Sequence, residues 1–370
     1  MIESNLPSEE GKNRRDVSST ARDDSSLPES YGDVLREYAA VRRGGAGMID
    51  LSSRGRLRVG GSEAVQFLNG LVTNDIKTLA QGDWMPAVFP NVQGRLIASV
   101  RIMRLADRQT ETSRSPVFLI DTEPIAHDTV FKSLQRFTHA GDFQVEDITR
   151  ETALISLQGQ KAGAIIETVV GHVPGLPVDH RLIETTWRDT NVILVRASHT
   201  AEAGFDVIID SSLATELWAA FLKLGAQPVG RQALEILRIE AGVPRQGIDI
   251  DETNVVSETN LDDAVSFTKG CYVGQEIIAR IKYRGHVAKK LAGLQFERAA
   301  KIERGAKVES PEAREIGWLT SVAYSPELGC TIALAYLRHQ YLVLGTRLRV
   351  LSGEKEYAAE VIELPFVRGR

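Results

Sequence analysis

The sequence predicts an α+β protein with two similar lobes, followed by a small β-barrel. Between residues 55 and 225, period-two strand patterns and apolar helical stretches follow one another twice in the same order. After Leu291 the helical patterns stop, and short strand-like segments with turn residues between them continue to the end. Such a run of short strands is typical of a small closed barrel or sandwich, so we expect a domain boundary near residue 290.

The first unit combines four strand patterns with two amphipathic helices. Ser62 is the expected N-cap of the first helix, and Pro124 opens the second, where a missing backbone N–H has no cost. Apolar residues recur along one face of each helix. The elements are expected at 55–61 (strand), 62–72 (helix), 84–105 (two strands around a turn), 115–121 (strand) and 124–138 (helix).

The second unit repeats this order. Its elements are expected at 153–159 (strand), 160–171 (helix), 191–198 and 204–210 (strands) and 211–225 (helix). "VGGSEAVQFL" and "LQGQKAGAII" both read as strand, glycine, polar residues and apolar helix, which suggests a duplicated strand–helix–strand unit. Chance similarity between two short strand-to-helix joints is the alternative. A helix at 230–242 and a polar segment from Val243 to Asp263 follow, and so long a segment is unusual unless it is functional.

Composition is that of a soluble globular protein, and the chain divides into a tail and two folded parts. Residues 1–30 form a polar, acid-rich tail without the apolar core of a signal peptide, so we expect a disordered extension of a bacterial cytoplasmic protein. No apolar run is long enough to span a membrane. We expect interleaved lobes at about 31–140 and 141–290, and the barrel at 291–370. The net charge of −5 argues against a nucleic-acid partner.

One of the two cysteines, Cys271, lies in the unusual stretch "SFTKGCYVGQE". "AVSF" predicts a buried strand, and the residues after Cys271 predict a helix with Gln275 and Glu276 in its first turn. A helix N-terminus and the nearby Lys269 both favour a thiolate, so we expect a lowered thiol pKa. The alternative is that Cys271 is a small buried hydrophobe. The other cysteine, Cys330, is expected in the core of a strand.

A basic run follows the same helix in this acidic protein. It consists of Arg280, Lys282, Arg284, Lys289 and Lys290. It is either a solvated face or a landing site for a polyanion such as the glutamate tail of a folate. The histidines show no metal-ligand spacing, and we expect no metal site.

"KGCYVGQE", residues 269–276, resembles the signature of the YgfZ family of folate-binding proteins that assist iron–sulfur cluster assembly. The resemblance extends through 234–252, 284–294 and the front block 61–96, and covers roughly residues 45 to 370. YgfZ proteins are relatives of the glycine-cleavage T-protein, an aminomethyltransferase that uses tetrahydrofolate. The resemblance implies a two-lobed, T-protein-like folate-binding domain with a central hole, a C-terminal β-barrel and tetrahydrofolate as cofactor.

The resemblance also implies folate-binding residues. "AEAGFDV" resembles a T-protein loop in which Glu202 takes the place of the pterin-binding glutamate, and a carboxylate can accept two parallel N–H bonds from a pterin. Arg238 takes the place of an arginine near the folate, with an ion pair to Glu235 or Glu240 as the alternative. The candidate folate-binding residues are Glu202, Arg238, Arg95, Tyr272, Gln275 and Glu276.

One departure from the T-protein directs the functional hypothesis. In "QGRLIAS", Ile97 and Ala98 stand where the T-protein has paired aspartates, and an apolar residue cannot deprotonate an amine. This argues against aminomethyltransferase activity. The leading hypothesis is therefore a tetrahydrofolate-binding accessory protein that assembles or repairs iron–sulfur clusters in client enzymes, with Cys271 and Lys269 as its functional centre. Two cysteines cannot hold a cluster alone. The alternatives are an aminomethyltransferase or another one-carbon transferase, including one that modifies RNA.

Overall fold

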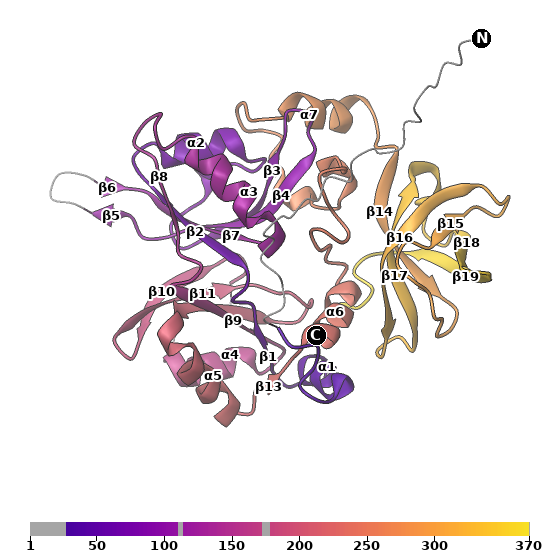
Figure 1. Ribbon diagram of the computed structural model, residues 1–370, viewed down its shortest axis with the longest axis horizontal. Coiled ribbons are helices and arrows are strands. Elements are labelled where there is room, and N and C mark those ends of the chain that lie inside the picture. Colours follow the sequence, from indigo (N-terminus) through magenta and orange to yellow (C-terminus); the bar gives the residue numbers. More distant parts are fainter. Residues whose placement is uncertain (1–26, 110–113, 172–177, 370) are drawn as a thin grey trace, which may run out of the picture.

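Two lobes and a barrel make up the protein, as seen in a computed structural model that describes residues 27–109, 114–171 and 178–369 (Figure 1). The sheets of the two lobes face one another, and each lobe carries its helices on the outer side of its sheet. Leu119 and Met103 of the first sheet and Leu154 and Ile208 of the second share one buried cluster. The lobes therefore form a four-layered body, and the predicted α+β architecture of two lobes and a terminal barrel is confirmed.

The first lobe contains the sheet β3-β4-β7-β2-β8. Its elements are β2 (Gly55–Gly60), α2 (Ala64–Leu71), β3 (Trp84–Pro90), β4 (Leu96–Arg104), β7 (Val117–Thr122), α3 (Pro124–Gln135) and β8 (Gln144–Asp147), with the short pair β5 (Arg108–Gln109) and β6 (Arg114–Ser115) beside them. The prediction that Ser62 is the N-cap of α2 is wrong, because Glu63 occupies the N-cap position. The Ser62 hydroxyl instead donates to Asp142 at 2.8 Å, because the chain after α3 returns to the joint between β2 and α2.

The second lobe contains the sheet β10-β11-β12-β9-β1-β13. Its elements are β1 (Gly47–Asp50), β9 (Thr152–Gln158), α4 (Ala162–Val170), β10 (Leu182–Trp187), β11 (Thr190–Arg196), β12 (Gly204–Asp210), α5 (Ala214–Lys223) and β13 (Gln227–Pro228). Strand β1 comes from before the first unit yet pairs with β9 and β13. The lobes are therefore interleaved in the chain.

The repeated glycine of the two units adopts the same backbone conformation in both. Gly61 follows β2 with φ 113°, and Gly159 follows β9 with φ 118°, a region that L-residues rarely enter. A Cβ atom on Gly61 would lie 2.1 Å from the Asp142 carbonyl oxygen, and one on Gly159 would lie 2.7 Å from that of Gly45. The shared strand order and the shared glycine agree with the predicted duplication.

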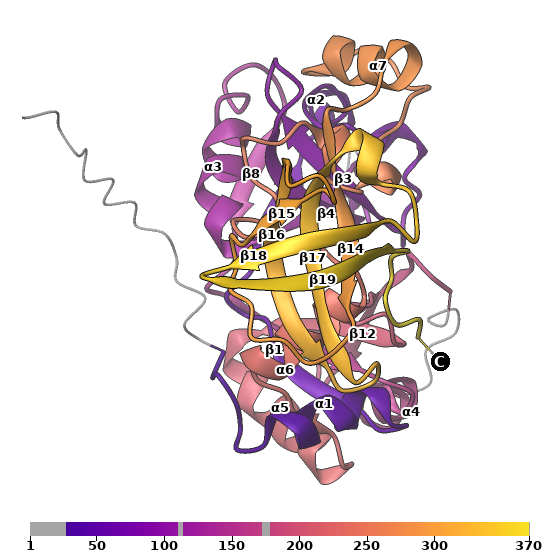
Figure 2. The same ribbon diagram turned by 90° about the vertical axis from the view of Figure 1, so that its right-hand side faces the viewer.

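The C-terminal part is a closed barrel in the order β14-β17-β16-β15-β18-β19 (Figure 2). Its strands are β14 (Lys289–Phe296), β15 (Lys307–Glu309), β16 (Glu315–Ser325), β17 (Cys330–Arg338), β18 (Arg347–Ser352) and β19 (Lys355–Ile362). Cys330 is buried, as predicted.

Helix α6 (Arg231–Glu240) lies between the second lobe and the barrel (Figure 1). The Glu240 carboxylate accepts hydrogen bonds from Tyr38 and Arg42 of α1 (Val34–Arg42) and from the hydroxyl of Ser325 in β16. This buried contact ties α1, α6 and the barrel together. None of the helices in the described part of the chain is long and apolar enough to cross a membrane.

Two predictions at the ends of the lobes need correction. The segment at 264–267 is not a strand: a short 3-10 helix, Asp262–Ala264, is followed by extended chain whose Ser266 N–H donates to the Thr73 carbonyl. Of the predicted disordered tail, residues 1–26 lie outside the described residues. Leu27 is buried against α6, and the Pro28 carbonyl accepts from the Arg231 N–H at the start of that helix.

Candidate functional site

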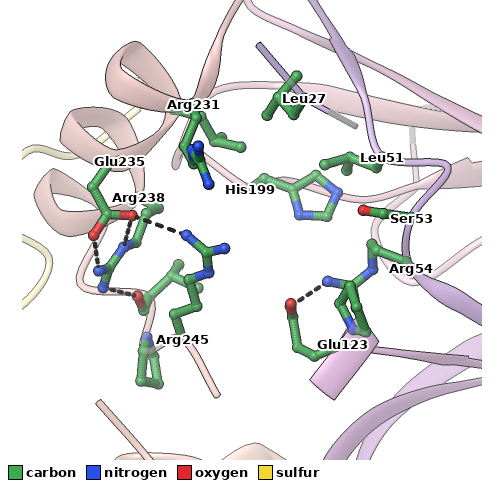
Figure 3. A pocket seen from close by; sticks show the side chains of 14 residues that line it. Leu27, Leu51, Ser53, Arg54, Glu123, His199, Arg231, Glu235, Arg238 and Arg245 are labelled. Atoms are coloured by element: carbon green, nitrogen blue, oxygen red, sulfur yellow. Dashed lines mark hydrogen bonds and ion pairs between the residues drawn. The ribbon is translucent and has the colours of Figure 1, made fainter. Parts of the chain in front are cut away.

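A pocket lies where loops of both lobes meet helix α6, and its cavity volume is about 100 Å³ (Figure 3). Six apolar residues line part of its wall: Leu27, Leu51, Pro124, Leu234, Val243 and Pro244. The charged part of the wall consists of Arg54, Arg231, Arg238, Arg245, Glu123 and Glu235, with His199 between the two groups. A wall that combines apolar side chains with a few charged groups is the kind of lining found in ligand-binding sites.

A chain of alternating charges leads from the pocket into the space between the lobes. Arg54 binds Asp121 through two parallel bonds of 2.8 and 2.9 Å and also contacts Glu123. Arg101 then bridges Asp121 and Asp206, with N···O distances of 2.7 Å to each. Asp121 lies on β7 and Asp206 on β12, so Arg101 joins the two sheets.

Asp121 and Asp206, the two buried aspartates in this series of charges, are ionised. Burial alone raises the pKa of Asp121, but Arg101 and Arg54 more than offset that effect and hold it below its usual range. Burial also opposes ionisation of Asp206, whereas His199 and Arg101 favour it, so the pKa of Asp206 is likewise lowered. Both carboxylates therefore act as acceptors.

His199 connects this charge chain to the pocket. It lies between β11 and β12, and its backbone N–H donates to the side-chain oxygen of Gln158 at 3.0 Å. Its Nε2 atom is 3.0 Å from each oxygen of Asp206, and 19% of its side chain is exposed. Figure 3 shows the ring directed into the pocket.

Arg238 is the one sequence-predicted site residue that lines this pocket. It forms the ion pair with Glu235 that was weighed as its alternative role, and it also contacts Asp249 and Ser321 at 2.6 Å each. Burial lowers its pKa, but these carboxylates reverse the effect and raise it. Arg238 therefore joins α6 to the polar segment and the barrel.

The long polar segment after α6 also reaches the first lobe. Gln246 donates to the Ile97 carbonyl at 2.7 Å and accepts from the Ser99 N–H at 3.0 Å, both on β4. Arg245, next to it in the chain, lines the pocket. The segment thus lines the pocket with Arg245 and contacts β4 with Gln246.

The other predicted folate-binding residues lie elsewhere. Glu202 is 2% exposed and ion-paired with Arg42 at 3.0 Å. Arg95 is exposed and donates to the Thr253 carbonyl at 2.5 Å. Tyr272 is buried, and burial raises its pKa to about 12. None of them is among the residues that line the pocket.

Lys269 lies against the C-terminal end of α2, and Cys271 follows it two residues later. The buried Lys269 ammonium donates to the carbonyls of Asn69, Val72 and Asn74 at 2.7, 2.9 and 2.6 Å, and burial lowers its pKa to about 8. Cys271 is exposed, so the alternative of a buried hydrophobe is wrong. Helix α7 (Gln275–Arg284) begins four residues later, after an N-cap at Gly274.

These contacts remove part of the argument for an activated thiol. The Lys269 ammonium donates its hydrogen bonds to backbone carbonyls at the end of α2. Cys271 precedes the first turn of α7 and does not lie within it. Gln275 and Glu276 do occupy that first turn, as predicted. Arg280, Lys282 and Arg284 are exposed, whereas Lys289 contacts the rings of Trp318 and Tyr336.

Most residues that line the pocket were not recognised from the sequence. Arg231 and Glu235 precede Arg238 by seven and three residues, so helical spacing places them on one face of α6. His199 stands two residues before "AEAGFDV", the stretch that resembles a T-protein loop. These two signals were available, but the contributions of Arg54 and Glu123 depend on how the lobes meet.

Comparisons with known proteins agree with the fold. A family model described as the GCVT N-terminal domain matches residues 22–269, and one described as the glycine cleavage T-protein C-terminal barrel domain matches residues 289–368. A crystal structure of the glycine cleavage system aminomethyltransferase T from Bartonella henselae covers 92% of this chain and 91% of its own, with a TM-score of 0.83 and 24% identity. At that identity it supports the fold.

Curated relatives span nearly the whole chain. An aminomethyltransferase from Nostoc sp. is 29% identical over 92% of this chain and 90% of its own. The aminomethyltransferase of Thermotoga neapolitana is 29% identical over 93% and 92%, and that of Rubrobacter xylanophilus is 30% identical over 92% and 88%.

These names contradict the leading functional hypothesis. They do not support an iron–sulfur accessory protein of the YgfZ type or iron–sulfur clients, and they contradict the inference that Ile97 and Ala98 exclude aminomethyl transfer. That inference rested on two positions of one strand, whereas the pocket is assembled from several elements of both lobes. With its N-terminal domain and its barrel both matched, the chain belongs to the glycine-cleavage T-protein family.

Proposed function

We propose that the protein is a folate-dependent one-carbon transferase of the aminomethyltransferase type, with tetrahydrofolate as the acceptor bound between the lobes. The observation that carries the proposal is the pocket itself, whose wall combines guanidinium groups, carboxylates and apolar side chains from both lobes and α6. The names of the full-length relatives support the same activity.

The residues of the pocket fit a reduced folate in kind. Leu51, Leu234 and Val243 offer apolar surface to a flat ring system. Arg231 and Arg245 offer planar donors to the carboxylates of a glutamate tail. The carboxylates of Glu123 and Glu235 can accept N–H bonds from the amino group of a pterin.

In this proposal the chain's residues position the reactants. Tetrahydrofolate supplies the nitrogen nucleophiles that take up the one-carbon unit. The apolar wall excludes water from one side of the pocket, and the arginines fix the acidic end of the ligand. The charge chain through Arg54, Asp121 and Arg101 holds the pocket wall in place, since each of these groups has a fixed partner.

The direct test is formation of methylene-tetrahydrofolate by the purified full-length protein, supplied with tetrahydrofolate and the aminomethyl-charged partner of the glycine-cleavage reaction. We expect product that depends on both substrates and on protein concentration. Absence of product from folded protein, under conditions where a known aminomethyltransferase is active, would contradict the proposal.

A further inference from the structure

His199 and Asp206 form a pair with the geometry of an oriented base inside the pocket. The Nε2 atom of His199 is 3.0 Å from both oxygens of Asp206, and the ring is directed into the pocket (Figure 3). Asp206 is fully buried and bound on its other side by Arg101 at 2.7 Å. A base that is held by a third group is the arrangement expected of a working acid–base residue.

The partner atoms determine which nitrogen of the ring is available. Since Asp206 is an ionised acceptor, Nε2 carries the hydrogen and donates it to the carboxylate. The other nitrogen, Nδ1, then keeps its lone pair. Among the described residues, no hydrogen-bond partner of Nδ1 is found, and 19% of the side chain remains exposed toward the pocket.

The competing acceptors in the pocket wall are already engaged. Glu123 is ion-paired with Arg54, and Glu235 is ion-paired with Arg238. A guanidinium partner favours the ionised carboxylate and makes it a weaker base. Within the described wall, His199 is the one side chain that offers an uncharged nitrogen lone pair.

We propose that His199, oriented by Asp206, is the general base that accepts a proton from a nitrogen of the bound substrate. The N–H bond of the substrate breaks, its electron pair stays on that nitrogen, and the proton bonds to Nδ1. The imidazolium that forms lies against the Asp206 carboxylate, which offsets its charge. This inference rests on the proposed one-carbon transfer and supplies the proton acceptor that Ile97 and Ala98 cannot provide.

Charged groups surround His199 in the pocket wall. They are Arg54 and Glu123 of the first lobe, Arg231, Glu235 and Arg238 of α6, and Arg245 after it, while Arg101 holds Asp206 on the protein side.

The test compares the full-length protein with His199→Gln, which keeps polar contacts but cannot act as a base. We expect kcat for methylene-tetrahydrofolate formation to fall about 100-fold. The affinity for tetrahydrofolate should change less than about threefold, because the folate contacts are retained. His127→Gln is the matched control: His127 also lies 3.0 Å from an aspartate, Asp147, but lines no part of the pocket.

A second measurement does not require turnover. Nitrogen-15 NMR of the histidine rings in the wild-type protein should show the His199 proton on Nε2 and none on Nδ1 at the pH of maximal rate. A proton on Nδ1 there, or a kcat of His199→Gln within threefold of wild type, would overturn the role of His199. An inactive wild-type protein would instead overturn the proposed function and, with it, the role of this base.

Discussion

The ammonium group of Lys269 holds three backbone carbonyls together where α2 ends. Each of these carbonyls belongs to the chain between Asn69 and Asn74, and the lysine is 7% exposed. Carbonyls at a helix end have no partner within the helix, so a buried cation satisfies them. The residue therefore stabilises the first lobe.

Replacing Lys269 with methionine should lower the free energy of unfolding by about 2–4 kcal/mol, because buried carbonyls would lose their donors. Urea unfolding at pH 7 measures the change. Lys282→Met is the control: Lys282 is exposed, and its removal should change stability by less than about 0.5 kcal/mol. Equal effects of the two substitutions would contradict this role.

The buried carboxylate of Asp206 makes stability depend on pH in the acid range. Its folded-state pKa is lower than in the unfolded chain, where an aspartate has a pKa near 3.9. Its contribution is therefore fully present above about pH 4 and is lost as the pH falls toward the folded-state value. Between pH 5 and 3, the wild type should lose more unfolding free energy than Asp206→Asn. Identical slopes in urea unfolding would contradict the assignment.

Among the residues, the sequence identified single positions better than their partners. It placed Cys330 in the core, and it offered an ion pair with Glu235 or Glu240 as the alternative role of Arg238, because both follow from spacing within one element. It did not find that Lys269 binds carbonyls about 200 positions earlier in the chain. Such contacts depend on the packing of distant segments, which composition and periodicity do not contain.

The strand-to-helix joints of the two units depend on glycine. Gly61 and Gly159 combine a positive φ with a backbone oxygen close to the place of a Cβ atom. Gly171 also has a positive φ, of 96°, but no atom lies within 4 Å of its Cβ position. Substitutions at these three positions therefore separate two free-energy costs of adding a Cβ atom: the strain of a positive φ and the overlap with neighbouring backbone.

Alanine at Gly61 or Gly159 should destabilise the protein by about 3 kcal/mol or more, since conformational strain and overlap with backbone add up. Gly171→Ala should cost about 1 kcal/mol, from conformation alone. Thermal and urea unfolding of the three variants measure the order. A cost at Gly171 that matches the other two would show that contact is unimportant at these joints.

At the level of elements, the sequence predicted the repeated helices and strands because their periodicity is local. It did not anticipate β1, a four-residue strand that pairs with β9 and β13 across about 100 positions or more. It also predicted a strand at 264–267, where the extended chain donates to the Thr73 carbonyl without joining a sheet. Apolar content there reflects burial in the cluster with Tyr272 and Ile278.

At the scale of the whole molecule, a charged contact joins the two lobes. Arg101 bridges Asp121 of one sheet and Asp206 of the other, and both carboxylates are fully buried. Removing the bridge would leave buried negative charges without sufficient compensation, which is strongly destabilising. The contact also positions the Asp206 carboxylate against His199.

Arg101→Met should lower the free energy of unfolding by about 3–5 kcal/mol. Arg58→Met is the matched control, because Arg58 pairs with Glu146 at 2.9 Å on the surface and its loss should cost less than about 1 kcal/mol. Urea unfolding of both variants checks the difference. If Arg101→Met were as stable as the wild type, the bridge would not hold the lobes together.

The position of the pocket follows from the whole molecule and not from any one segment. Its wall takes residues from 27 to 245, and Arg54, His199 and Arg245 approach only when both lobes and α6 are assembled. The sequence therefore points to "KGCYVGQE" as the functional site, because its residues are contiguous, whereas the residues of the pocket are dispersed along the chain. The predicted residue boundaries of the domains stay a prediction.

The central claim is that the pocket between the lobes binds a reduced folate, and calorimetric titration with tetrahydrofolate tests it most directly. The wild-type protein should bind one folate per chain. The double variant Arg231→Gln, Arg245→Gln should bind at least about tenfold more weakly, since two charge-assisted contacts are lost, while Arg58→Gln should bind as the wild type does. No binding by the wild type, or equal affinity of the double variant, would contradict the account.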